Sequence, residues 1–151
     1  MAELKERLRA DLTEAMRARD QVRLRTLRLA LTSITNEEVA GASARDLTDD
    51  EIVRVLTREA RKRREAAEAF SAAGRADQAA AERAEGDVLA AYLPAQLSDE
   101  ELAALVAAAI DETGATAMSA MGQVMKTVTP RVAGRADGAR VAAEVRRRLS
   151  A

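Results

Sequence analysis

Apolar residues recur every three or four positions along most of this chain, and that spacing favours helices over strands. Leu4, Leu8 and Leu12 form the first such stripe, with Lys5 and Arg9 expected on the solvent-facing side of the same helix. Ala, Leu, Arg and Glu, which favour helices, make up much of the sequence, whereas it has one Phe and one Tyr. The sequence therefore predicts an all-α protein.

Helix ends are marked by capping residues and glycines. Thr48 with Glu51, and Ser98 with Glu101, read as two capping boxes, in which each partner satisfies a backbone N–H of the other. Glycine is favoured just after a helix, so the second helix is expected to end near Gly41. The predicted helices span about residues 2–19, 21–41, 48–74, 75–92, 98–114, 118–128 and 141–149, with a turn-rich connection at 130–138.

The segment Tyr92-Leu93-Pro94 separates two groups of helices. A residue that precedes proline disfavours the helical conformation, so the fourth helix is expected to end there. We expect residues 1–94 to form an N-terminal four-helix domain and residues 95–151 to form a small three-helix C-terminal domain. A domain of the second length is small but can still bury a core.

The chain has no His and no Cys, which removes the commonest general base near neutral pH and all thiol chemistry. Ser98 and Ser119 lie where helix caps are expected, and acidic pairs lie in first helical turns, where they stabilise the helix dipole. No phosphate-binding glycine loop and no metal-ligand spacing is present. We therefore expect no catalytic residue, no metal and no cofactor.

The sequence also bears on location. No apolar run approaches the roughly 20 residues needed to cross a bilayer, and residues 1–6 lack the apolar segment of a secretory signal. A chain without cysteine fits a reducing compartment. We expect a cytoplasmic protein with no membrane partner.

Basic side chains cluster on the third predicted helix. Arg54, Arg58, Arg61 and Lys62 fall on one helical face, and Glu59 is the one acid between positions 54 and 64. Such a stripe is either a solvated helix face or a row of cations that contact phosphates. Arg58, Arg61 and Lys62 are therefore candidate RNA contacts.

A second basic cluster lies in the last 33 residues, which hold seven basic residues against two acids. Complementing a helix dipole explains Arg146–Arg148, but it does not explain Lys126, Arg131 and Arg135. We expect these three cations to form one phosphate-binding surface. Phe70 is expected inside the core, so RNA would be held by its backbone and shape rather than by base stacking.

Three segments, residues 92–102, 121–126 and 134–138, resemble the YqeY-like protein family, and residues 24–29 fit it as well. The resemblance covers essentially the whole chain. It implies a two-domain helical protein related to the C-terminal tail of GatB, a subunit of the tRNA-dependent amidotransferase that amidates misacylated Glu-tRNA or Asp-tRNA.

The GatB tail is implicated in holding tRNA, while catalysis resides in domains that this chain lacks. A family label of carbon–nitrogen ligase activity with glutamine as amido-N-donor would be inherited from GatB. Gly122 and Gly134 either serve close helix approach and a turn with positive φ, or let an RNA backbone come near Lys126 and Arg135. The residues that match the GatB tail are Gly122, Val124, Met125, Lys126, Gly134 and Ala136.

Three functions follow from these observations. The first is a non-catalytic tRNA-binding module associated with the tRNA-dependent amidotransferase. The second is an adaptor that recruits an amidotransferase subunit or another protein through apolar contacts near Leu93, Leu97 and Met118. The third is a ligase in its own right, for which the residue pattern offers no machinery.

Overall fold

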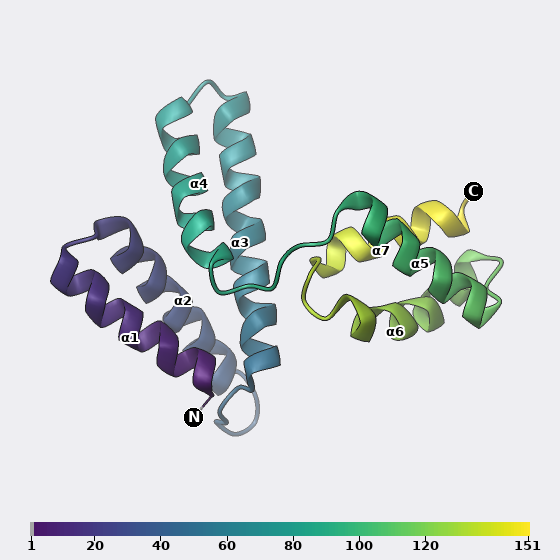
Figure 1. Cartoon of the computed structure of the whole chain (residues 1–151), viewed down its shortest axis with the longest axis horizontal. Coiled ribbons are helices and arrows are strands. Elements are labelled where there is room, and N and C mark those ends of the chain that lie inside the picture. Colours follow the sequence, from purple (N-terminus) through teal and green to yellow (C-terminus); the bar gives the residue numbers. More distant parts are fainter. Residues whose placement is uncertain (1) are drawn as a thin grey trace. The chain divides into compact units, whose positions relative to one another are not determined.

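The structure is a computed structural model that describes residues 2–151. Within that range the chain forms seven α-helices and one short 3₁₀ helix, and no strand (Figure 1). The all-α prediction is confirmed. The chain divides into two compact units, one ending at Leu93 and the other beginning at Pro94.

The N-terminal unit contains α1 (Glu3–Ala18), α2 (Gln21–Val39), α3 (Asp49–Ala72) and α4 (Ala76–Ala90). The helices α3 and α4 lie side by side as an antiparallel pair, joined by a turn in which Gly74 has a φ of 74° (Figure 1). Buried aliphatic side chains from all four helices form one core: Leu8, Leu27, Ile34, Ile52, Leu56 and Leu89.

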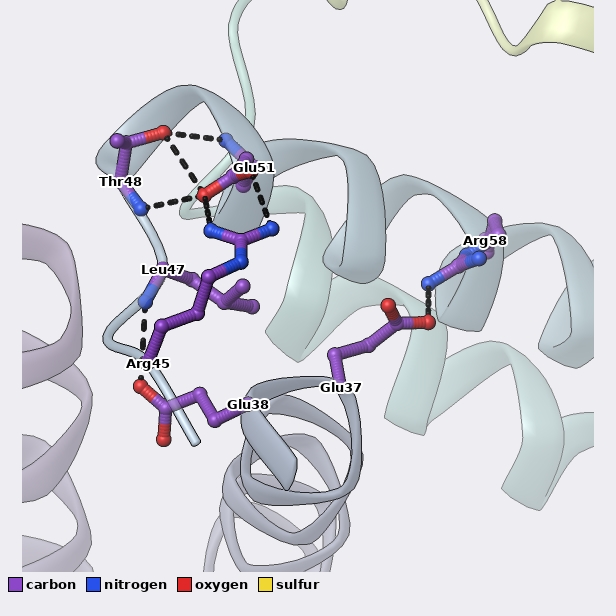
Figure 2. Close-up of polar contacts among 7 residues, drawn as sticks. All are labelled: Glu37, Glu38, Arg45, Leu47, Thr48, Glu51 and Arg58. Atoms are coloured by element: carbon purple, nitrogen blue, oxygen red, sulfur yellow. Dashed lines mark hydrogen bonds and ion pairs between the residues drawn. The ribbon is translucent and has the colours of Figure 1, made fainter. Parts of the chain in front are cut away.

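The capping box predicted at the start of α3 is confirmed (Figure 2). Thr48 Oγ1 accepts the Glu51 N–H at 3.2 Å, and a Glu51 carboxylate oxygen accepts the Thr48 N–H at 2.9 Å. Arg45 adds two parallel hydrogen bonds to the same carboxylate, at 2.8 and 2.9 Å. This geometry is the strong bidentate form of a guanidinium–carboxylate pair. The α2–α3 connection is therefore fixed by polar contacts at its end.

The helix α2 ends near Gly41, as predicted, but the expected glycine cap is wrong. The helix ends at Val39, the capping residue Ala40 has helical angles, and Gly41 is not among the residues with positive φ. The chain is turned instead by Glu38, whose backbone oxygen accepts the Arg45 N–H at 3.0 Å and whose carboxylate accepts the Leu47 N–H at 3.3 Å. A buried side chain thus replaces the left-handed glycine.

The predicted solvent-facing position of Lys5 is also wrong. Lys5 is 5% exposed, and its ammonium lies 2.6 Å from Glu38 Oε1. Glu38 is 33 positions away in the sequence, so no local pattern in α1 reports this partner. The lysine is buried because the packing of α1 on α2 places a carboxylate opposite it.

The C-terminal unit contains α5 (Asp99–Thr113), the 3₁₀ turn η1 (Met118–Ala120), α6 (Met121–Val132) and α7 (Gly138–Leu149). Ser98 caps α5 with the predicted capping box, and Gly114 ends it with a φ of 66°. Each helix contributes one apolar stripe to a shared core, formed mainly by Leu102, Val106, Val124, Val128, Val141 and Val145.

The helix α6 continues through Pro130, so the connection predicted to begin at that residue starts three positions later. Proline has no N–H, and the Lys126 carbonyl therefore loses its helical donor. The last turn remains helical because Val128 and Val132 continue the stripe begun by Val124 and are buried at 0% and 3% exposure. Burial of Val132 outweighs the single missing hydrogen bond.

In residues 2–151 we find no helix with both the length and the apolar character that spanning a membrane requires.

Candidate nucleic-acid interface

The exposed face of α6 carries Gly122 and Lys126 one helical turn apart. At 3.6 residues per turn, these two positions lie about 40° apart around the helix axis. The stripe of Val124 and Val128 faces the core, which leaves Lys126 exposed on the far side of the helix. Across the described residues, the Lys126 ammonium has no hydrogen-bond or ion-pair partner. Its charge is therefore available to a ligand.

Gly122 has no local structural need to be glycine. A Cβ built at this position meets nothing within 4 Å, and the residue is not among those with positive φ. The interpretation that it serves close helix approach is therefore wrong. The backbone of the first turn of α6 is instead open to solvent beside Lys126.

Arg131 lies on a different face of α6 from Lys126. Five positions separate them, which corresponds to about 140° around the axis. The Arg131 guanidinium donates to the carboxylate of Glu112, in the last turn of α5, and both side chains remain partly exposed. The three cations expected on one surface are thus divided between two faces.

Arg135 lies beside Arg131 at the end of α6. Its Nε donates to the Val132 carbonyl at 3.4 Å and its Nη2 to the Arg131 carbonyl at 3.5 Å, so the guanidinium caps the helix C-terminus. Its own carbonyl accepts the Leu97 N–H at 2.7 Å. The Arg135 carbonyl therefore joins the α6–α7 connection to Leu97, the residue before the Ser98 cap of α5.

The remaining residues on which the resemblance to the GatB tail rests have structural explanations. Val124 and Ala136 are buried in the C-terminal core, at 0% and 6% exposure, and Met125 packs against that core. Gly134 has a φ of 78°, so its predicted role in a turn with positive φ is confirmed. Of the uncharged matching residues, Gly122 is the one without a structural role of this kind.

The second predicted patch, on α3, consists of cations that face carboxylates. Arg58 Nη2 lies 2.6 Å from Glu37 Oε1 (Figure 2). The other two pair within their own helix, Lys62 with Glu59 at 3.3 Å and Arg61 with Glu65 at 3.8 Å. Exposed pairs of this kind are weak, so a phosphate can displace them, but their charge is partly balanced at rest.

Sequence reasoning missed an ion-pair network that links α2, α3 and α4. Glu85 is 7% exposed, accepts a hydrogen bond from Arg25 Nε at 2.7 Å and forms an ion pair with Arg63 at 3.2 Å. Arg63 also lies within 4.0 Å of Glu59 and Glu82. The spacing of Glu59 and Arg63, four positions apart, is typical of an ion pair within one helix. No local pattern in the sequence indicates that α2, α3 and α4 converge on Glu85. The network ties the helices together.

Neither aromatic residue offers a stacking platform. Tyr92 is 8% exposed, its hydroxyl donates to Asp11, and the Arg7 guanidinium lies 4.6 Å from its ring centroid. Burial and the neighbouring carboxylate raise the pKa of Tyr92 to about 12. Phe70 is half-buried, so the expectation that it lies inside the core is wrong. Base stacking on an aromatic ring is therefore unsupported.

The apolar surface expected for a protein partner is smaller than predicted. Leu97 belongs to the C-terminal core at 4% exposure, so its predicted contact role is wrong. Leu93 is half-buried against the N-terminal core, and Met118 is 42% exposed. Met118 alone of the three presents substantial apolar surface.

Across residues 2–151, no group of three or more acidic side chains is arranged to hold a metal ion. The fold and these side chains define an all-helical protein with an exposed lysine beside the open helix backbone at Gly122.

The sequence matches the family model described as YqeY-like protein over residues 5–149. The chain therefore belongs to the YqeY-like protein family. A comparison with curated proteins gives no match.

Proposed function

We propose that this chain is a non-catalytic tRNA-binding module whose primary contact is the exposed face of α6. The observation that carries the proposal is the pairing of an unpartnered Lys126 with the open backbone at Gly122. A phosphate needs a cation and room for close approach, and these two positions offer both. The resemblance to the GatB tail favours tRNA as the source of that phosphate.

Backbone recognition also fits the placement of the aromatic side chains within their own unit. Tyr92 is buried and Phe70 is half-buried, so sequence readout by stacking has no support. Arg131 and Arg135 lie at the end of α6, and Arg58, Arg61 and Lys62 form a patch in the N-terminal unit. They are proposed as secondary contacts, because all five are engaged with protein groups.

The test is tRNA binding measured by fluorescence anisotropy over a range of salt concentrations. Lys126→Gln is expected to weaken binding and to make the slope of log K against log salt shallower by about 0.9, the value for one phosphate contact. Arg146→Gln is the matched control, because Arg146 is an exposed cation on α7 that lies outside the proposed face. Undetectable binding at low salt, or equal effects of the two substitutions, would overturn the proposal.

We further propose that the bound tRNA is a substrate of the tRNA-dependent amidotransferase, with no amidation by this chain itself. Preference for tRNA that accepts glutamine over unrelated tRNA would support the association. Ammonia-dependent turnover of misacylated tRNA by the purified protein would contradict the non-catalytic assignment. A protein adaptor is the alternative, and a salt-resistant complex that depends on Met118 would favour it.

The two compact units are proposed to be separate domains, a four-helix domain at 1–94 and a three-helix domain at 95–151. Each has its own buried apolar cluster, which is the property that lets a domain fold alone. Two resolved transitions in thermal unfolding, or independent folding of each segment, would support this organisation. Unfolded separate segments would contradict it.

A further inference from the structure

The Arg131 guanidinium is held by a carboxylate where a phosphate could bind. Arg131 Nη2 donates to Glu112 Oε2, which places the end of α5 against the end of α6. The side chains are 37% and 58% exposed, so the pair lies at the surface and is open to a competing anion. The Arg131 backbone is fixed separately, because its carbonyl accepts from Arg135.

A carboxylate and a phosphate present similar oxygen pairs to a guanidinium, and both bind it in a planar, bidentate manner. An exposed ion pair is weak, at about 0–1 kcal/mol, so displacement of Glu112 requires little free energy. Arg131 is about 7.5 Å further along the α6 axis than Lys126 and about 140° around it, so a released guanidinium would contact a different phosphate of the same RNA backbone from the one at Lys126. The released guanidinium can then extend the phosphate contacts of α6.

We propose that Glu112 is a built-in competitor of RNA, an intramolecular phosphate mimic that occupies Arg131 and lowers the affinity of the tRNA site. The inference rests on the proposed function, since the competing anion is the tRNA backbone. Glu112 sets the affinity, because each bound tRNA must displace the carboxylate before Arg131 joins the contact. Removal of the Glu112 carboxylate frees the Arg131 guanidinium without adding a cation to the protein.

The experiment compares Glu112→Gln with Asp111→Asn in tRNA binding at one low salt concentration. Both substitutions remove one acidic charge from the last turn of α5, and Asp111 is exposed with no described side-chain partner. A negative charge near a helix C-terminus interacts unfavourably with the helix dipole. Neither variant should therefore unfold α5, because each removes such a charge. Circular dichroism and the melting temperature verify this.

Glu112→Gln is expected to tighten tRNA binding about two- to fivefold, the range for release of an exposed ion pair, and Asp111→Asn to change it less. In an Arg131→Gln background, the effect of Glu112→Gln should shrink to that of Asp111→Asn. Such a double-mutant cycle isolates the pairwise contribution.

Two outcomes would overturn the inference while leaving tRNA binding intact. One is an equal effect of Glu112→Gln and Asp111→Asn, which would indicate general charge repulsion alone. The other is an undiminished gain in the Arg131→Gln background. If neither wild type nor Glu112→Gln binds tRNA, the proposed function itself fails and the inference fails with it.

Discussion

The Lys5 ammonium lies 2.6 Å from Glu38 Oε1, and both side chains are at most 10% exposed. The same carboxylate accepts the Leu47 N–H, so this one pair joins α1, the end of α2 and the α2–α3 connection. Hydrogen bonding to Lys5 lowers the pKa of Glu38 against the opposing effect of burial. The carboxylate is therefore charged in the folded protein and depends on its partner.

Lys5→Met is expected to lower the free energy of unfolding by about 3–5 kcal/mol, because it leaves the Glu38 charge buried without a partner. Adding Glu38→Gln should recover much of the loss, since the amide oxygen can still accept the Leu47 N–H. Urea unfolding followed by circular dichroism measures both variants. Equal losses in the single and double variants would show that the ion pair contributes nothing beyond packing.

Stability is expected to decline as the pH falls from about 5 toward 2. Arg45 and the Thr48 N–H lower the pKa of Glu51 to about 2, and Arg147 and Arg148 lower that of Glu144 to about 2. A carboxyl with a lowered folded pKa stabilises above its ordinary value near 4.3, and this contribution is lost as the pH falls through the folded value.

Glu51→Gln should therefore flatten the acid limb of a plot of urea midpoint against pH. The variant should be less stable than wild type at pH 7 and approach it near pH 2, where the wild-type carboxyl is protonating. A difference that stays constant over this range would mean that the Glu51 charge is not responsible.

Ala133→Gly is expected to stabilise the C-terminal unit by roughly 0.5–1 kcal/mol. Ala133 follows α6 with a φ of 51°, a left-handed conformation that is unfavourable for residues with a Cβ. Glycine adopts this conformation without strain, although it loses more entropy on folding. Thermal unfolding measures the shift, and Ala143→Gly, at an exposed position within α7, is the control that should destabilise.

Substitutions at Gly122 should separate stability from RNA binding. Gly122→Ala is expected to raise the free energy of unfolding by up to about 1 kcal/mol, because the position is helical and its Cβ direction is open. Gly122→Leu should fold as well and yet bind tRNA roughly tenfold more weakly, the effect of losing one charge-assisted hydrogen bond. Unchanged affinity for Gly122→Leu would remove this backbone from the proposed contact.

Local patterns in the sequence predicted most of the secondary structure. The capping boxes at Thr48 and Ser98 formed as expected because a capping box involves residues three positions apart. The stripe of Val141, Val145 and Leu149 is buried because its spacing matches one helical turn. The errors at Gly41 and Pro130 arose where other contacts overrode the preference of the single residue. At Gly41 these are the hydrogen bonds of Glu38 to Arg45 and Leu47, and at Pro130 the packing of Val132 in the C-terminal core.

The sequence by itself therefore determined the helical class, the helix ends that are set by capping and the type of residue available to bind an anion. Only the tertiary structure decided which charges remain available. Lys5 forms an ion pair with Glu38 and Arg131 forms one with Glu112, whereas Lys126 has no ion-pair partner among the described residues. Nothing nearby in the sequence distinguishes the three. The physical reason is that a charge is neutralised by its neighbours in space, and helix packing brings those neighbours from positions 19 to 33 residues away.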